Sequence, residues 1–273
     1  MSARRRRFGL LGAIAFLALG SAAWLDLGPA GLWPGPHAFE QLGRFAAAAA
    51  APALRGQSDL ALPTLPRALE AALHTVAFAA AATSLALAAG AVLGVLASRR
   101  WWRRVGAPRG LGAAGHAAVR IAIGLLRSVH ELLWAAVLLA AFGLHPAAAV
   151  LAIALPYAGT LAKVFSEMLD EAPDDVALAL EGAGAAPLAS FAFGLLPRVL
   201  PDAGAYAFYR FECALRSAAV LGFFGFPTLG KLVWESAGQL YYNELWTYLY
   251  TLIALIVAVE AWSAALRQRL TVA

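Results

Sequence analysis

Three charged residues, Arg210, Glu212 and Arg216, lie in an otherwise apolar segment that begins near Pro201. At 1.5 Å per residue along a helix they lie roughly 13 to 22 Å beyond Pro201. A charged side chain at the centre of a membrane helix costs about 2.5–3.5 kcal/mol, so we expect these residues to face other helices or a polar path. Glu212 and Arg216 are spaced i, i+4 and could pair on one helical face, which would leave Arg210 unpaired.

A second group of charges interrupts the apolar segment between residues 113 and 142. Arg120 and Arg127 precede Glu131, and the last two belong to the polar run RSVHE. Together with the charges beyond Pro201, they give four arginines against two glutamates. This excess makes a cationic interior that suits a small oxyanion such as a phosphonate, phosphite or phosphate. The alternative is that the charges only neutralise one another between helices.

No catalytic or metal-binding pattern accompanies these charges. The run GFPTLGKL, residues 225–232, has the G-x-x-x-x-G-K spacing of a phosphate-binding loop, but Leu232 stands where a Mg²⁺-binding Ser or Thr is needed. We expect instead a turn or short re-entrant element at the external end of the path, where Gly222, Gly225 and Gly230 let helices close against one another. The five histidines have no i, i+4 pairing and no acidic partner set, so we expect no metal site.

Composition identifies the surroundings of these residues. Of 273 residues, 62% are apolar and 14% are charged, and the mean hydropathy is +0.71, whereas about 25% of a soluble domain is charged. The sequence therefore predicts an all-α integral membrane protein in contact with lipid. The net charge of +5 does not indicate a nucleic-acid partner, because the basic residues flank apolar spans instead of covering one face. The single cysteine, Cys213, excludes a disulfide framework.

About six spans follow from the need for about 20 apolar residues per membrane helix. A basic N-terminus, 1–7, precedes a first membrane anchor at 8–25, which we expect to be uncleaved. The proline-rich residues 26–66 then predict an extended periplasmic loop. The core, 67–270, holds the remaining five spans, near 69–98, 113–142, 146–165, 201–224 and 245–266.

The arginines indicate how these spans are oriented. With six spans, the basic clusters at 4–7, 99–109 and 267–269 all fall on one side of the membrane, which the positive-inside rule assigns to the cytoplasm. We therefore expect a multi-pass protein of the bacterial inner (plasma) membrane with both termini cytoplasmic. Residues 166–200 would then form a cytoplasmic loop.

This loop has the signals of two short helices. Asp174 and Asp175 favour a helix start, Gly182 and Gly184 favour its end, and Pro187 favours the start of a second helix. The run LLPRVLP, residues 195–201, predicts a corner leading back into the membrane.

The same residues resemble the EAA loop of ABC-importer permeases. The resemblance lies in GAA at 184–186, then Gly194 within the run GLLPRVLP. The following YAFYRFECALRSAAVLGFFGFPTLG, 206–230, is similar to the phosphonate-type permease family, as is the upstream stretch from RSVHE to SEMLDE. The match covers residues 65–270, and its motifs are specific in combination but weak singly.

The resemblance implies a type I ABC-importer permease fold, which pairs with a second permease copy or a paralogue. The partners would be a cytoplasmic ABC ATPase dimer and a periplasmic substrate-binding protein. ATP and Mg²⁺ would be bound by the ATPase, so this chain would be a transport subunit, not an enzyme, and would hold no cofactor. The loop within 170–200 would act as a coupling helix on the ATPase through Leu178, Glu181, Gly182, Gly184, Ala185, Ala186 and Pro187.

One position departs from the family pattern. Counting back from Gly184, the glutamate that names the EAA motif falls on Leu178, and Glu181 stands three residues closer to the glycine. Either Glu181 supplies the polar contact, or the interface is more apolar than usual.

Two other classes of protein remain open. An intramembrane enzyme acting on an anionic lipid or phosphate substrate could use the arginines, but it needs a nucleophile or base, and only His116, His130 and His145 are available near them. A secondary transporter would more often show inverted repeats, which we do not find in this sequence.

Overall fold

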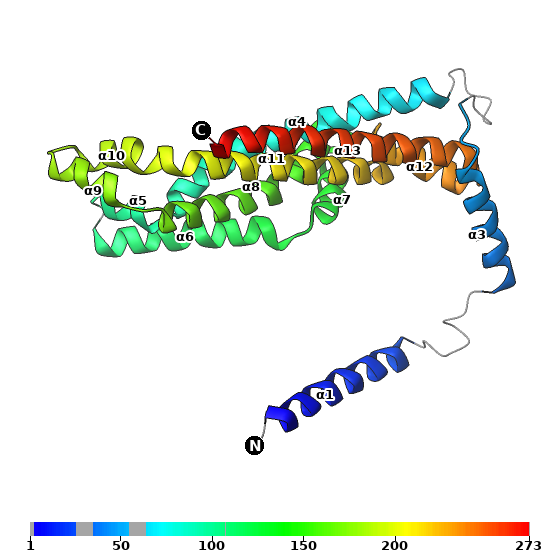
Figure 1. The fold of residues 1–273 in the computed structure, drawn as a ribbon, viewed down its shortest axis with the longest axis horizontal. Coiled ribbons are helices and arrows are strands. Elements are labelled where there is room, and N and C mark those ends of the chain that lie inside the picture. Colours follow the sequence, from blue (N-terminus) through cyan, green and yellow to red (C-terminus); the bar gives the residue numbers. More distant parts are fainter. Residues whose placement is uncertain (1–2, 26–34, 55–63, 107, 273) are drawn as a thin grey trace. The chain divides into compact units, whose positions relative to one another are not determined.

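The computed structural model describes residues 3–25, 35–54, 64–106 and 108–272, and its regular elements there are all helices (Figure 1). The chain divides into two compact units, residues 1–51 and 52–273. The first contains α1 (Ala3–Trp24) and α3 (Pro36–Ala49). The second contains α4 (Thr64–Ala97), α5 (Arg99–Arg104), α6 (Arg109–Ser128), α7 (Glu131–Phe142), α8 (Pro146–Glu171), α9 (Asp175–Gly182), α10 (Pro187–Ser190), the π-helical turn η1 (Phe191–Leu195), α11 (Leu196–Val220), the 3-10 turn η2 (Leu221–Phe224), α12 (Leu229–Gly238) and α13 (Tyr242–Val272).

The helices correspond in place to the predicted spans. In the described part of the chain α4, α8 and α13 are each long and apolar enough to cross a membrane. Two bent pairs add up to two more candidate spans, α6 with α7 and the run 187–224 with α12, and α1 contains a shorter apolar helix at Phe8–Trp24. Length and composition therefore support an all-α membrane protein of the predicted kind.

Small residues hold α4 against α8. Ala79, Ala82 and Ala86 of α4 are fully buried. A Cβ added at Gly90 or Gly94 would lie 2.7 Å from the Cβ of Leu161 or 2.9 Å from the Cβ of Phe165. Backbones that approach this closely gain van der Waals contact, which is the main attraction between helices in lipid.

Three features of the fold differ from the sequence-based expectations. Residues 36–49, expected in an extended loop, form the helix α3, while 26–34 and 55–63 lie outside the described residues. The predicted third span is two helices, bent by 87° at the RSVHE break. The predicted corner at LLPRVLP is wrong, because α10, η1 and α11 follow one another without a gap and Pro201 lies inside α11. Pro197 is in the first turn of α11, where a missing N–H costs nothing.

One end of the larger unit carries the short helices. Figure 1 shows α5, α9 and α10 together at the end of the bundle where α4 and α8 finish and α6 and α11 begin. Trp101 of α5 meets Phe191 of η1 edge to face, with ring centroids 5.4 Å apart. Leu169, Leu195 and Val199 complete the apolar cluster beneath them. This cluster fixes the loop that the sequence predicts to be cytoplasmic.

Candidate functional site

The predicted coupling loop folds into a compact projection, residues 174–190, which we call the knob. Asp174 is at the N-cap position of α9, where the sequence predicts a helix start, although its side chain makes no capping hydrogen bond, and the helix is followed by a left-handed turn at Gly184, whose φ is +91°. The N–H groups of Gly184 and Ala185 donate to the carbonyls of Glu181 and Leu180, the arrangement of a Schellman cap. Pro187 then starts α10 as expected.

The knob is pressed tightly onto the start of α11. A Cβ at Gly194 would lie only 2.8 Å from the Cα of Ala177, and Ala177 is itself fully buried. Asp175 pairs with Arg198 of α11. The knob is therefore packed against η1 and tied by an ion pair to the first turn of α11.

Glu181 faces into the fold, where α5 and α10 hold it. Its Oε1 accepts hydrogen bonds from Arg104 Nε at 3.0 Å and from Ser190 Oγ at 2.6 Å. Arg104 also donates from Nη2 to Asp174 Oδ1 at 2.7 Å. We call this set, Arg104 with Asp174 and Glu181, the arginine clamp.

The clamp changes the acidity of both carboxyl groups. The hydrogen bond from Ser190, followed by that from Arg104, lowers the pKa of Glu181. Burial alone would raise the pKa of Asp174, but the hydrogen bond from Arg104 and the charge of Arg100 bring it below its ordinary value. Both carboxylates are therefore ionised at neutral pH and already matched to a cation of this chain.

The predicted contact positions of the knob from Gly182 onward, together with Leu178, form an uncharged surface. Leu178 is 57% exposed and Leu188 is 56% exposed, and the remaining predicted contact positions between them, Gly182, Gly184, Ala185, Ala186 and Pro187, carry no charge. Contiguous exposed apolar residues on a protein surface usually mark a binding site. Of the two alternatives left by the sequence, this geometry favours apolar packing through Leu178 over a polar contact through Glu181.

In the larger unit Arg210 and Glu131, which the sequence singles out, are linked through two residues that it does not. The Arg210 guanidinium lies over the ring of Tyr157 in α8, 4.0 Å from its centroid. The Tyr157 hydroxyl is 3.0 Å from Ser217 Oγ, which donates to Glu131 Oε1 at 2.8 Å. Arg210 and Ser217 are two turns apart on the same face of α11, so this face joins a cation, two hydroxyls and a carboxylate.

Arg127 belongs near this set and Arg120 does not. Arg127 is exposed at the end of α6, and both it and Arg210 act electrostatically on the hydroxyl of Tyr206. Arg120 instead donates to Ser166 Oγ at 3.1 Å. In the described residues Arg210 Nε has no hydrogen-bond partner, so this guanidinium retains donor capacity for a ligand.

The expected pair between Glu212 and Arg216 is wrong. Glu212 pairs with Arg267, and Arg216 pairs with Glu260 at 2.9 Å, because α13 packs along this side of α11 and presents both partners. Arg267 belongs to the terminal cluster that the sequence assigns to the cytoplasmic side. Glu212 therefore lies beside that cluster.

The glycines of the predicted external gate meet as closely packed backbones. A Cβ at Gly222 would lie 2.1 Å from the backbone N of Lys231, and one at Gly230 would lie 1.9 Å from the carbonyl O of Ala219. Gly225 has φ +96° and forms the turn between η2 and α12. The run 225–232 is thus a turn that leads into a helix, as the sequence suggests.

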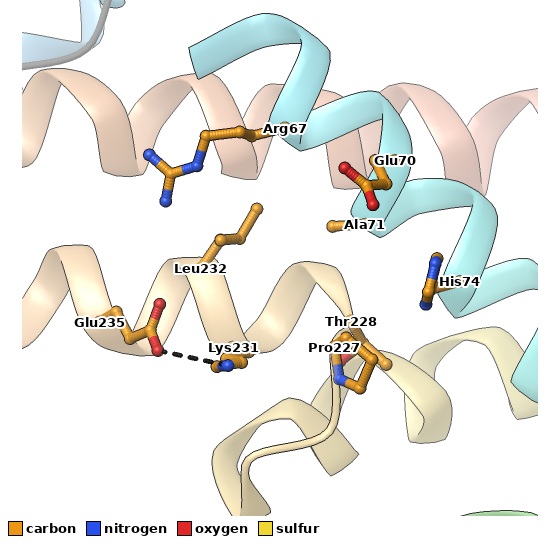
Figure 2. A pocket seen from close by; sticks show the side chains of 9 residues that line it. All are labelled: Arg67, Glu70, Ala71, His74, Pro227, Thr228, Lys231, Leu232 and Glu235. Atoms are coloured by element: carbon orange, nitrogen blue, oxygen red, sulfur yellow. Dashed lines mark ion pairs between the residues drawn. The ribbon is translucent and has the colours of Figure 1, made fainter. Parts of the chain in front are cut away.

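A pocket of about 230 Å³ lies beside this turn, between α4 and α12 (Figure 2). Arg67, Glu70 and His74 reach into it from α4, and Lys231 and Glu235, 3.7 Å apart, face them from α12. The mixture of charges gives the pocket no preference for one sign, and we assign no ligand to it.

Sequence reasoning missed Arg104, Tyr157 and Ser217. Arg104 stood in RRWWRR, which indicated only membrane orientation, and the two hydroxyl residues resemble ordinary packing positions. The sequence carries no signal for this role of Arg104, because carboxylates in a solvated loop do not need a cation from the chain.

Comparison with known proteins gives one family match that covers most of the chain. The family described as binding-protein-dependent transport system inner membrane component matches residues 86–272. The sequence is 34% identical over 155 residues to a putative phosphite transport system permease protein, HtxE, of Stutzerimonas stutzeri, and the match covers 57% of this chain and 59% of HtxE. It is 32% identical over 201 residues to the phosphite transport system permease protein PtxC of the same organism, covering 72% of this chain and 68% of PtxC.

Other similarities are more distant. The phosphate-import permease protein PhnE of Mycolicibacterium smegmatis is 28% identical over 204 residues, 73% of this chain and 36% of PhnE. Among solved structures, an inward-facing MetNI methionine ABC transporter matches with a TM-score of 0.66 at 19% identity, over 77% of this chain and 99% of the matched chain. The structural match shows that the permease fold is shared.

Proposed function

Since this chain belongs to the family of binding-protein-dependent transport system inner membrane components, we propose that it is the permease subunit of an ABC importer for a small phosphorus oxyanion. Its cargo would be a phosphonate, phosphite or phosphate delivered by a periplasmic binding protein. The chain itself is a transport component, and its family gives no support to the alternative of an intramembrane enzyme.

The observation that carries the coupling role is the orientation of the knob. The carboxylates of Asp174 and Glu181 pair within the fold, in the arginine clamp, while Leu178 and Leu188 are more than half exposed. An apolar knob of this size needs an apolar groove to cover it, and we assign that groove to a cytoplasmic ABC ATPase. ATP and Mg²⁺ would be bound there.

The route from the knob to the path runs through α11. Gly194 fixes the knob to its start, and Arg210 and Ser217 lie further along the same helix. A push on the knob when the ATPases close would shift the Arg210 face relative to Tyr157 of α8. Arg127 and Arg210 would attract the oxyanion, while Glu131 would keep its binding weak enough for release.

The orientation and the assembly are part of the same proposal. Both termini and the knob would be cytoplasmic in a bacterial inner membrane, and the turn at Gly222, Gly225 and Gly230 would close the periplasmic end. The functional permease would contain two such subunits, either two copies of this chain or this chain and a paralogue. That second subunit would cover the exposed side of Arg127.

Uptake by the assembled transporter tests this function. The chain would be reconstituted in proteoliposomes with its partner ATPase and binding protein, and accumulation of labelled phosphite, phosphate and methylphosphonate would be measured. We expect ATP-dependent uptake of at least one of them, and unlabelled sulfate should compete poorly. ATP-dependent uptake of none of the three would contradict the assigned cargo.

A further inference from the structure

A second cavity, of about 490 Å³, opens between α5, α6 and α8 at the end of the bundle that carries the knob. We call it the arginine pocket. Its lining residues are mostly cationic: Arg99, Arg100, Arg103, His116, Arg120, Glu167 and Asp170. It lies apart from the Arg210 set, and the proposed transport cycle gives it no role.

The two carboxylates of the pocket already have partners. Glu167 accepts from Lys163 Nζ at 2.8 Å. Asp170 accepts from Ser98 Oγ at 2.7 Å and from the backbone N–H groups of Arg99 and Arg100, both at 3.3 Å. Asp170 therefore caps the start of α5, and its hydrogen bonds come from Ser98 and from backbone N–H groups, not from an arginine side chain.

The arginines of α5 differ in their ion pairs, although Arg100 and Arg103 each line both the arginine pocket and the cavity beside the clamp. Arg100 and Arg104, spaced i, i+4, pair with Asp174 of the knob. Arg99 and Arg103 have the same spacing and line the arginine pocket. In the described residues no carboxylate lies within ion-pair distance of the side chains of Arg99, Arg103 or Arg120. Within the described residues these three guanidinium groups thus line the cavity without ion pairs of their own, although the carboxylates of Glu167 and Asp170 share its lining.

The frame of the pocket is rigid. The Trp102 indole N–H donates to the carbonyl O of Leu96 at 2.7 Å. The Trp102 ring lies so close to α6 that a Cβ at Gly115 would be 2.5 Å from it. Arg120 is held from the other side by its hydrogen bond to Ser166. The side chain of Arg120 is thus positioned before a ligand binds, which reduces the entropy that it loses on binding.

We propose that the arginine pocket binds a phosphate group through Arg99, Arg103 and Arg120. Guanidinium groups match phosphate oxygens in geometry and charge, and basic pockets between membrane helices on the cytoplasmic side accept anionic headgroups. The phosphate could belong to an anionic phospholipid or to a free oxyanion in the cytoplasm. Because α5 also carries Arg104 of the arginine clamp, occupancy of the pocket would stabilise the base of the knob.

The test measures binding by the purified full-length chain and does not depend on transport. In one arm the chain is placed in nanodiscs of phosphatidylcholine with or without phosphatidylglycerol, and retained phosphatidylglycerol is counted by native mass spectrometry. In the other arm, inorganic phosphate is titrated against the thermal unfolding temperature in phosphatidylcholine nanodiscs. The variants are Arg103→Gln, the double variant Arg99→Gln/Arg103→Gln, and Arg103→Lys, which keeps the charge. Arg269→Gln removes an exposed arginine from the same predicted side of the membrane but outside the pocket.

We expect Arg103→Gln to weaken binding about fivefold and the double variant roughly 25-fold, as about 1 kcal/mol per arginine near an anionic surface implies. Arg103→Lys should lose less binding affinity than Arg103→Gln, and Arg269→Gln should bind both probes as the wild type does. An effect in the first arm identifies a lipid headgroup, and one in the second identifies a free anion. The proposal is overturned if the double variant binds both probes like the wild type, or if Arg269→Gln weakens binding as much as Arg103→Gln. Failure of oxyanion uptake would leave this result unaffected.

Discussion

Replacing Leu178 with alanine removes the exposed apolar side chain of the knob that stands where the EAA motif has its glutamate. The side chain is 57% exposed, and full burial of a leucine contributes about 1.5–3 kcal/mol. Covering the remaining 57% in a partner groove would therefore contribute about 1–1.7 kcal/mol. Leu178→Ala should weaken the affinity of the ATPase for the permease by about fivefold to fifteenfold.

The assay is equilibrium binding of the purified ATPase to the permease in nanodiscs, with thermal unfolding of the permease measured in parallel. Leu200→Ala is a matched control, because Leu200 is also 57% exposed but lies outside the knob. It should leave ATPase affinity unchanged. The argument is refuted if Leu178→Ala binds the ATPase like the wild type while Glu181→Gln loses binding without loosening the knob.

Three further predictions concern the clamp, the base of the knob and the path. The pKa values of both carboxyl partners of Arg104 are lowered in the fold. The clamp should therefore stabilise the protein above their unfolded pKa values of about 4 and lose this effect as pH falls through the folded values. The unfolding temperature of Arg104→Gln should then change less between neutral pH and pH 3 than that of the wild type, and an equal change in both proteins would argue against the clamp. Gly194→Ala should lower the free energy of unfolding by about 1–3 kcal/mol, because the new methyl group overpacks against the α9 backbone. Gly182→Ala is the control and should be tolerated, since nothing lies within 4 Å of its new Cβ. Similar unfolding temperatures for the two variants would be inconsistent with this packing. Arg210→Gln should reduce oxyanion uptake strongly without releasing the ATPase. Arg216→Gln loses only a half-exposed ion pair and should change the free energy of unfolding by less than about 1 kcal/mol. If Arg210→Gln took up oxyanion as fast as the wild type, Arg210 would not belong to the path.

The parts of the site that depend on local sequence were predictable. Asp174 at an N-cap position, Gly184 as a left-handed turn and Pro187 as a helix start each act through the backbone within a few residues. The same holds for the apolar spans, whose length is set by the membrane. These signals place the knob and its limits without any knowledge of tertiary contacts.

The parts that depend on distant partners were not predictable. Glu181 meets Arg104 across 77 residues of sequence, and the orientation of its side chain decides which surface the knob presents. Glu212 and Arg216 appeared to pair because one helix offers only that arrangement, whereas their real partners come from α13, 55 and 44 residues away. Charged residues of a membrane helix pair with residues of the helices packed beside it, and the sequence does not show which helices are adjacent.

The continuous start of α11 has a similar origin. Two prolines, Pro197 and Pro201, suggested a corner, but the first sits in the opening turn of the helix and the second follows the π-helical turn η1 closely enough for the helix to continue. As a result the knob is joined to α11 by a helix and not by a hinge. This is the mechanical basis of the proposed coupling.

ATP hydrolysis by the separated and assembled components tests the central claim most directly. The rate would be measured for this chain alone, for the ATPase alone, and for the complex with and without the oxyanion-loaded binding protein, using the wild type and Leu178→Ala. The account predicts no hydrolysis by this chain, stimulation of the wild-type complex by the loaded binding protein, and weaker stimulation with Leu178→Ala. Hydrolysis by the purified chain alone, or full stimulation of a complex from which residues 174–190 have been deleted, would contradict it.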